Sequence, residues 1–144
     1  RTGSRSPMQW DDSTNAGFSS APASDLYIAM DPDKDRPTAK KEMAAPDSLY
    51  HEVKKLIRIR QSHKALQSRG KITFVYAEKN TYPLAYIRED GDEKILVIIN
   101  AAAEAKTFAC DAEPKEAIYN FGAAAEAKNG KITVPAQSAG FYRI

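Results

Sequence analysis

The feature that most limits how this chain can fold is a series of short strand-like segments that begins at residue 71. Residues 72–76 and 84–88 are rich in β-branched and aromatic side chains, and residues 94–99 are apolar after Lys94. Shorter segments of the same kind lie near residues 107–110, 117–121, 132–134 and 140–144. Seven strands at this spacing predict a mainly β fold, an antiparallel Greek-key β-sandwich over residues 71–144.

Turn signals separate these segments. Asp90-Gly91-Asp92 and Asn129-Gly130 are typical of tight hairpins. Because residues 94–99 are apolar on both faces, we expect them to form a central strand. The two alanine-rich runs, residues 101–105 and 123–127, are expected to be loops or short helical turns between strands.

One clear helix is predicted before the strands, over residues 47–66. Asp47 or Ser48 can cap its first turn. Apolar residues recur at helical spacing and form one stripe: Leu49, Val53, Leu56 and Ile57. The helix is expected to end before Gly70.

The first 46 residues are expected to be irregular. They hold five of the eight prolines: Pro7, Pro22, Pro32, Pro37 and Pro46. An irregular region of this length is uncommon in a compact domain unless it is functional or covers another surface. We therefore expect the apolar residues 26–30 to dock on a surface outside this chain.

Composition excludes several classes of protein. The net charge of +2 is too balanced to indicate a nucleic-acid surface. No apolar run approaches the roughly 18 residues that span a bilayer. No basic-then-apolar leader is present, so a cytoplasmic location is expected for the whole protein, with secretion as the open alternative.

The single cysteine, Cys110, cannot form a disulfide within the chain. It lies at the end of the strand-like segment 107–110, so a buried, unreactive thiol is expected rather than a nucleophile. No Cys/His spacing supports a zinc site, and neither a metal nor a cofactor is expected.

The most informative motif lies near the N-terminus. It reads Ser4-Arg5-Ser6-Pro7-Met8-Gln9-Trp10-Asp11, followed by Asn15-Ala16-Gly17-Phe18. This motif resembles the segment that follows the eighth barrel strand in glycoside hydrolase family 13. The similarity is to the branch that holds α-glucosidases, oligo-1,6-glucosidases, dextran glucosidases and trehalose synthases. Ser6 stands where those enzymes usually have threonine.

The resemblance continues along most of the chain. Further segments are similar to the last barrel helix, its usual ending and the strands of the C-terminal sandwich: residues 47–60, 63–66, 83–91, 95–100 and 137–144. Lys64 stands where proline is common. The implied fold is the amylase C-terminal sandwich, preceded by an irregular loop region and the last helix of a (β/α)8 barrel. Residues 1–70 would then end the barrel domain, and residues 71–144 would form the sandwich domain.

The resemblance also implies a chemistry. The family uses an aspartate nucleophile, a glutamate acid/base and a second aspartate, and it retains configuration at the anomeric carbon. That route needs two carboxyl groups about 5–5.5 Å apart. In the family these residues follow earlier barrel strands, so no residue of this chain is assigned a catalytic role. Glu52 and Glu89 are interpreted as ordinary surface acids.

The motif supplies candidate substrate-binding residues, because loops after the strands of such a barrel line its active-site face. The candidates are Arg5, Gln9, Trp10 and Asp11. Arg5 can bind a sugar hydroxyl or brace a carboxylate. Trp10 can stack on a sugar ring or fill the barrel rim. For Gln9, Asp11 and Asn15, hydrogen bonds that brace the loop are the alternative to substrate contacts.

Two functional hypotheses remain open. In the first, the chain is the inactive C-terminal part of an enzyme that processes α-glucosides, its partner is the missing barrel, and its sandwich stabilises that barrel. In the second, the sandwich binds glucan independently, through a platform of Tyr82, Tyr86 and Tyr142. Without the barrel, the helix stripe and residues 18–30 are expected to self-associate, or residues 18–30 to be disordered.

Overall fold

The structure, a computed structural model, describes residues 5–144. Ser4, at the start of the motif, lies outside the described residues. The chain divides into two compact units, Arg1–Ile57 and Arg58–Ile144, and the division falls inside helix α2 (Leu49–Ser62). The domain boundary expected at residue 70 stays a prediction.

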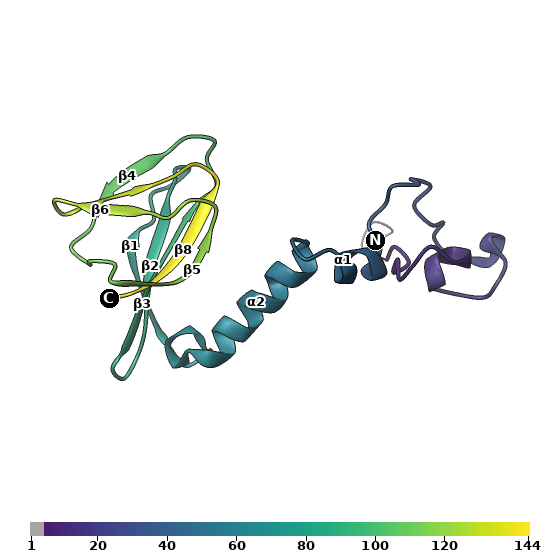
Figure 1. The fold of residues 1–144 in the computed structure, drawn as a ribbon, viewed down its shortest axis with the longest axis horizontal. Coiled ribbons are helices and arrows are strands. Elements are labelled where there is room, and N and C mark those ends of the chain that lie inside the picture. The colour runs from purple at the N-terminus through teal and green to yellow at the C-terminus, as the bar shows by residue number, and fades with distance from the viewer. Residues whose placement is uncertain (1–4) are drawn as a thin grey trace. The chain divides into compact units, whose positions relative to one another are not determined.

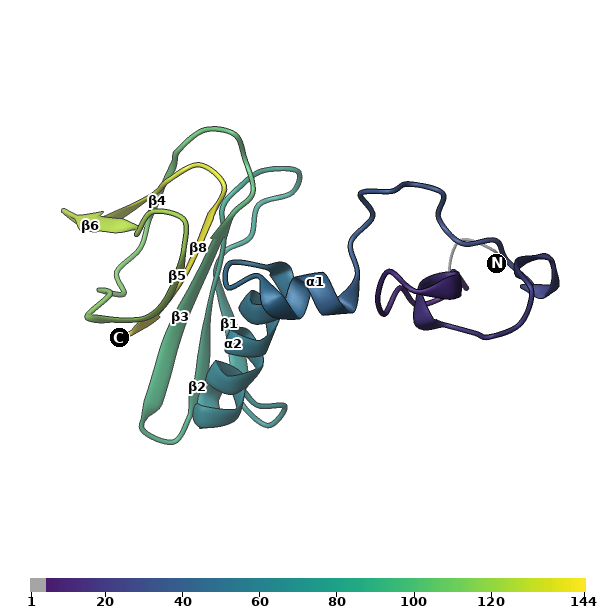
Figure 2. The same ribbon diagram turned by 45° about the vertical axis from the view of Figure 1, so that its right-hand side comes forward.

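The second unit is a sandwich of two antiparallel sheets, as the sequence predicts (Figure 1). Its strands are β1 (Lys71–Tyr76), β2 (Leu84–Asp90), β3 (Glu93–Asn100), β4 (Lys106–Ala109), β5 (Glu116–Phe121), β6 (Glu126–Lys128), β7 (Lys131–Val134) and β8 (Ser138–Arg143). The five-stranded sheet has the order β1-β2-β3-β8-β5, and the three-stranded sheet has the order β4-β7-β6. The chain crosses from one sheet to the other after β3, β4, β5 and β7. The two sheets form two layers (Figure 2).

Strand β3 is central, as predicted from its apolar sequence, because it pairs with β2 on one side and β8 on the other. Successive side chains of a strand point to opposite faces. Leu96 and Ile98 therefore face the three-stranded sheet and pack in one core cluster with Phe108. Ile95 and Val97 face the other way and join a second cluster. All four of these β3 side chains are at most 1% exposed.

One strand was not expected from the sequence. The alanine-rich residues 123–127 end in β6 rather than in a loop or helical turn, whereas residues 101–105 form a loop as expected. The cause is the turn that follows, in which Asn129 and Gly130 take left-handed φ angles of 53° and 69°. That turn closes a tight hairpin, so the preceding residues pair with β7 although alanine has little preference for strands.

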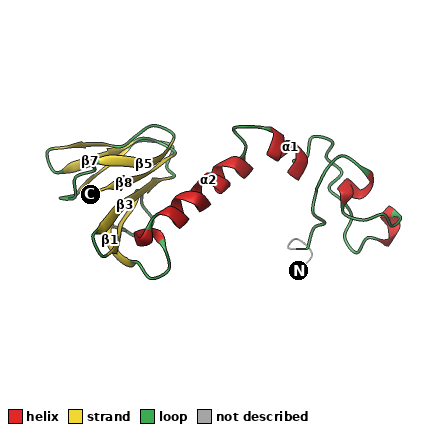
Figure 3. Cartoon of the chain, turned by 60° about the horizontal axis from the view of Figure 1, so that its bottom comes forward, coloured by secondary structure: helices red, strands yellow, loops and turns green. Residues whose placement is uncertain are grey.

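The predicted helix is present but shorter than residues 47–66. Helix α2 ends at Ser62, and a separate 3-10 turn, Lys64–Leu66, follows it before β1 (Figure 3). Ser48 directly precedes the helix, but its buried hydroxyl donates a hydrogen bond of 2.5 Å to the carbonyl of Glu42. Cys110 is buried at 7% exposure, and burial raises the pKa of its thiol, as expected for an unreactive cysteine.

The first unit is mostly irregular, as its prolines predict. It contains 3-10 turns at Thr14–Gly17 and Ala23–Asp25, and a short helix α1 (Ala39–Ala44) that the sequence analysis did not predict. The buried Thr38 caps α1, because its Oγ1 accepts a hydrogen bond of 3.3 Å from the amide of Lys41. Among residues 5–144, no helix combines the length and the apolar character needed to cross a membrane.

Candidate functional site

The loop that carries the candidate residues is anchored to the start of helix α1. The amide of Ala39 donates to the carbonyl of Gln9 at 2.8 Å, and the amide of Lys40 donates to the carbonyl of Trp10 at 2.9 Å. The first amides of a helix lack partners inside it, and here the loop backbone supplies them. Two segments almost thirty residues apart in the sequence are thereby held together.

Asp11 organises the tip of this loop. Its Oδ1 accepts hydrogen bonds from the amide of Ser13 at 2.9 Å and from the Ser13 hydroxyl at 2.5 Å. These bonds, the hydroxyl first, lower the pKa of Asp11 below its ordinary value of 3.8. Asp11 is therefore a fixed, ionised acceptor at neutral pH. The loop-bracing role that the sequence analysis weighed against substrate contact is observed for this residue.

The backbone after Ser13 turns through three consecutive left-handed residues. Asn15, Ala16 and Gly17 have φ angles of 50°, 53° and 71°. Such a conformation costs roughly 1–2 kcal/mol for a residue with a Cβ, and strain of this kind concentrates at functional sites. A Cβ at Gly17 would lie 3.0 Å from Oδ1 of Asp11, so glycine is needed there for space as well as for its φ angle.

Hydrogen bonds hold this turn in place. The amides of Trp10 and Asp11 both donate to the carbonyl of Ala16, at 2.9 and 3.2 Å. The side-chain amide of Asn15 donates to the carbonyls of Ser19 and Ala21, at 3.0 and 2.7 Å. Asn15 therefore braces the loop, and its amide nitrogen is already used in doing so.

The four candidate residues differ in how they are held. The backbone amides of Trp10 and Asp11 donate to one carbonyl, that of Ala16, whereas Arg5 is exposed and lies in an irregular stretch before the buried Pro7. Trp10 is 52% exposed, so about half of its surface is accessible in this chain. Gln9 is half-buried, and its Oε1 is buried without a hydrogen-bond partner. An unpaired buried oxygen is costly, which makes Gln9 a candidate to receive a donor from a substrate or a neighbouring segment.

The tyrosines of the alternative hypothesis do not form one exposed platform. Tyr142 is 5% exposed, and its hydroxyl donates to Asn120 Oδ1 at 2.7 Å and accepts from the amide of Ala125 at 3.0 Å. Tyr86 is half-buried against the second core cluster, and its ring also lies edge-on to the exposed ring of Phe74. Of the three tyrosines, Tyr82 is exposed, at 45%. These three tyrosines therefore do not form the shared stacking platform that the alternative hypothesis requires of them.

A second polar cluster was missed by the sequence analysis. It lies within the second unit and centres on Glu93, which contacts His63 and Arg143. The alternation along β3 places Glu93 on the same face as Ile95, and this pattern is the signal that could have revealed the cluster.

Glu52 and Glu89, which the sequence analysis interprets as surface acids, are both partly exposed. Oε1 of Glu52 lies 4.0 Å from Nζ of Lys55, and Oε1 of Glu89 lies 3.2 Å from Nζ of Lys94.

Comparison with known proteins gives this geometry its context. Residues 1–69 match the family model of the alpha amylase catalytic domain. The chain belongs to the α-amylase family, glycoside hydrolase family 13. Two curated relatives confirm its resemblance to the α-glucosidase branch of this family.

Two curated relatives belong to that branch. A glucan 1,6-alpha-glucosidase from Streptococcus pneumoniae serotype 4 is 30% identical over 94% of this chain and 24% of its own length. An oligo-1,6-glucosidase from Parageobacillus thermoglucosidasius is 34% identical over 75% of this chain and 18% of its own length. The chain thus spans about a quarter or less of the length of these relatives.

The same extent of similarity is found among solved structures. The trehalulose synthase MutB from Pseudomonas mesoacidophila MX-45 matches 96% of this chain and 25% of its own, with a TM-score of 0.79 and 29% identity. The order of loop, helix and sandwich is therefore shared with an enzyme of the family.

Proposed function

We propose that this chain is the C-terminal, non-catalytic portion of an enzyme that processes α-glucosides. The observation that carries the proposal is the extent of the match: nearly the whole chain aligns with about a quarter of a glucan 1,6-alpha-glucosidase. The part that aligns contains a loop, a helix and a sandwich in the order that the family resemblance predicts. Whether the whole enzyme hydrolyses or transfers glucosyl groups depends on residues outside these 144.

The chemistry assigned to the whole enzyme is retaining cleavage by an aspartate nucleophile and a glutamate acid/base. In the family these residues follow barrel strands that precede the loop described above. Within this chain, Oδ1 of Asp11 accepts two hydrogen bonds from Ser13, so this carboxylate is engaged in bracing the loop. We therefore assign the catalytic residues to the barrel and none of them to this chain.

The loop of residues 5–18 is proposed to form one wall of the sugar pocket. Asp11 and Asn15 fix its shape through the hydrogen bonds described above. Trp10 is a half-exposed aromatic residue, and Gln9 offers an unpaired acceptor. Arg5 supplies a planar set of donors for a sugar hydroxyl or a neighbouring carboxylate. Rigid loops on a fixed scaffold are the usual carriers of binding residues.

The partner of this chain is proposed to be the barrel of the same enzyme. Three apolar side chains of α2 are exposed here: Leu49 at 74%, Val53 at 44% and Ile57 at 52%. Burying a side chain of this size contributes about 1.5–3 kcal/mol. A barrel packed on this stripe would gain that energy. Self-association of the chain on its own, and the cytoplasmic location of the enzyme, stay predictions.

The stabilising role of the sandwich is tested by deleting residues 71–144 from the whole enzyme. The midpoint of thermal unfolding is expected to fall, because the truncated helix end loses its contacts with the sheet, while substrate preference is expected to stay unchanged. Differential scanning calorimetry measures the first effect, and rates on 4-nitrophenyl α-glucoside and isomaltose measure the second. An unchanged midpoint would argue against the stabilising role.

A further inference from the structure

The segment that joins helix α2 to strand β1 lies against the second face of the five-stranded sheet. This connecting segment, residues 63–70, contains the 3-10 turn Lys64–Leu66. Ala65 is fully buried there and packs on Ile95 and Val97, the β3 residues that point away from the three-stranded sheet. The segment is thus part of the core of its unit rather than a flexible linker.

Two charged side chains of the sheet fasten the connecting segment. Arg88 of β2 lies opposite Ile95, and its Nη2 donates to the carbonyls of Gln67 and Gly70, at 2.6 and 3.0 Å. Glu93, the first residue of β3, lies on the same face and holds the other end of the segment. Its Oε2 accepts from the amide of Ala65 at 2.9 Å.

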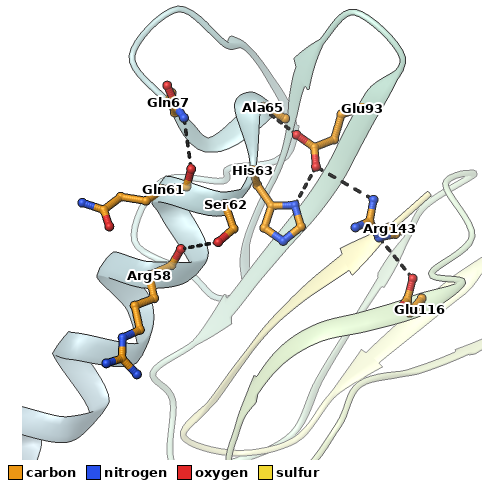
Figure 4. Close-up of polar contacts among 9 residues, drawn as sticks. All are labelled: Arg58, Gln61, Ser62, His63, Ala65, Gln67, Glu93, Glu116 and Arg143. Atoms are coloured by element: carbon orange, nitrogen blue, oxygen red, sulfur yellow. Dashed lines mark hydrogen bonds and ion pairs between the residues drawn. The ribbon is translucent and has the colours of Figure 1, made fainter.

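The second oxygen of Glu93 is also engaged (Figure 4). Its Oε1 lies 2.6 Å from Nδ1 of His63 and 3.9 Å from Nη1 of Arg143. Since an ionised carboxylate only accepts hydrogen bonds, His63 donates from Nδ1. The side chains of His63 and Glu93 are 12% and 19% exposed, so little water competes for these bonds. One carboxylate therefore joins the start of the connecting segment to β3 and β8.

The charges around Glu93 explain why it stays ionised. Arg143 of β8 faces it and is itself held by Glu116 of β5, whose Oε2 lies 3.1 Å from Nε of Arg143. Asp90, across the hairpin, is a like charge in register with Glu93. Arg58 of α2 turns its guanidinium away from the cluster (Figure 4). Lys94 alternates to the opposite face, where it pairs with Glu89.

The balance of these effects lowers the pKa of Glu93. Burial alone would raise it, but the hydrogen bonds from the Ala65 amide and from His63, together with the charges of His63 and Arg143, outweigh burial. A carboxyl group whose pKa is lowered in the folded state stabilises that state fully at pH values above its ordinary pKa of 4.5. This stabilisation is lost as the pH falls through the lower, folded value.

We propose that Glu93 is an acid-released clamp, a positioning residue that holds the start of the connecting segment, directly after helix α2, on the sandwich. When the carboxylate of Glu93 is protonated, it gains an O–H donor. It also loses the negative charge that faces His63 and Arg143. The amide of Ala65 then loses its charged acceptor, and the start of the connecting segment loosens, while Arg88 still binds the carbonyls of Gln67 and Gly70 at its other end. Leu96 and Ile98 pack on the opposite face of the sheet, so their cluster should survive the release.

The test is an NMR titration of the whole 144-residue chain from pH 7 to pH 3. The chemical shift of the Ala65 amide proton should change with a single midpoint at a pH below 4.5. The chemical shift of the side-chain carboxyl carbon of Glu93 should change with the same midpoint. Over the same range, the protection of the Ala65 amide from hydrogen exchange should fall by at least about tenfold. The amides of Leu96 and Ile98 should stay protected, which would show that the sandwich is intact.

Two matched variants isolate the clamp. In Glu93→Gln, the Ala65 amide proton should already have at pH 7 the chemical shift that the unchanged chain reaches at pH 3. That chemical shift should then no longer change with pH. Glu116→Gln removes the same charge next to Arg143 but no bond to the connecting segment, so the titration should persist with a midpoint that moves little. The proposal is overturned if Glu93→Gln leaves the Ala65 titration unchanged, or if the Leu96 and Ala65 amides lose protection together.

Discussion

At the scale of single residues, Gly70 shows how tightly the connecting segment is packed. A Cβ at this position would lie 2.2 Å from the carbonyl oxygen of Ala65 and 2.9 Å from Nη2 of Arg88. The first of these neighbours is backbone, so a larger residue must displace the turn itself. The sequence analysis used Gly70 only as the limit of the helix. Its close contact with Ala65 depends on the path of the chain, which no local pattern encodes.

Gly70→Ala is therefore expected to destabilise the chain by about 1–3 kcal/mol, the usual cost of inserting a methyl group into a packed site. Ser68→Ala is the matched control, because Ser68 is exposed in the same segment and should change stability by less than about 0.5 kcal/mol. Urea unfolding followed by circular dichroism measures both variants. Equal stability of the two would show that the segment tolerates a Cβ and is loosely held.

The candidate loop was predicted in part from single residues. The motif located Gln9, Trp10 and Asp11 in one loop, and the structure holds all three through backbone hydrogen bonds. The pairing of this loop with residues 39–40 could not be read from the sequence, because it joins segments that share no pattern. The roles of these residues toward a sugar stay proposals.

At the scale of elements, hydrophobic patterning predicted most of the sandwich. It succeeded for β3, where burial on both faces leaves a continuous apolar run. It failed for β6, whose residues are exposed and whose pairing is imposed by the turn that follows. It also missed α1, which has only six residues and whose first amides depend on the distant loop for partners. Short elements of this kind are set by tertiary contacts rather than by their own sequence.

Ile98→Ala in β3 is expected to cost about 2–5 kcal/mol, because it opens a cavity between the two sheets. The same substitution at Ile72 in β1 provides the control: Ile72 is 47% exposed, so its side chain leaves little or no cavity, whereas Ile98 is fully buried. Denaturant unfolding of the two variants should separate them clearly. A smaller loss for Ile98→Ala than for Ile72→Ala would contradict the sandwich core described here.

At the scale of the whole molecule, resemblance carried information that patterning did not. Strand spacing predicted a sandwich, but the link to α-glucosidases came from the motif around Trp10 and from the match along nearly the whole chain. The proposed barrel would account for the exposed apolar stripe of α2 and for the unpaired Oε1 of Gln9. The catalytic groups could not be located from this sequence, since we assign them to the barrel.

The central claim is that this chain shapes an α-glucosidase without performing its chemistry. The most direct measurement compares turnover of 4-nitrophenyl α-glucoside by the isolated 144-residue chain and by the longer protein that contains it, at equal molar concentration. We predict release of 4-nitrophenol by the longer protein and none above the buffer rate by the isolated chain. Turnover by the isolated chain, or a longer protein that cleaves no α-glucoside, would contradict the account.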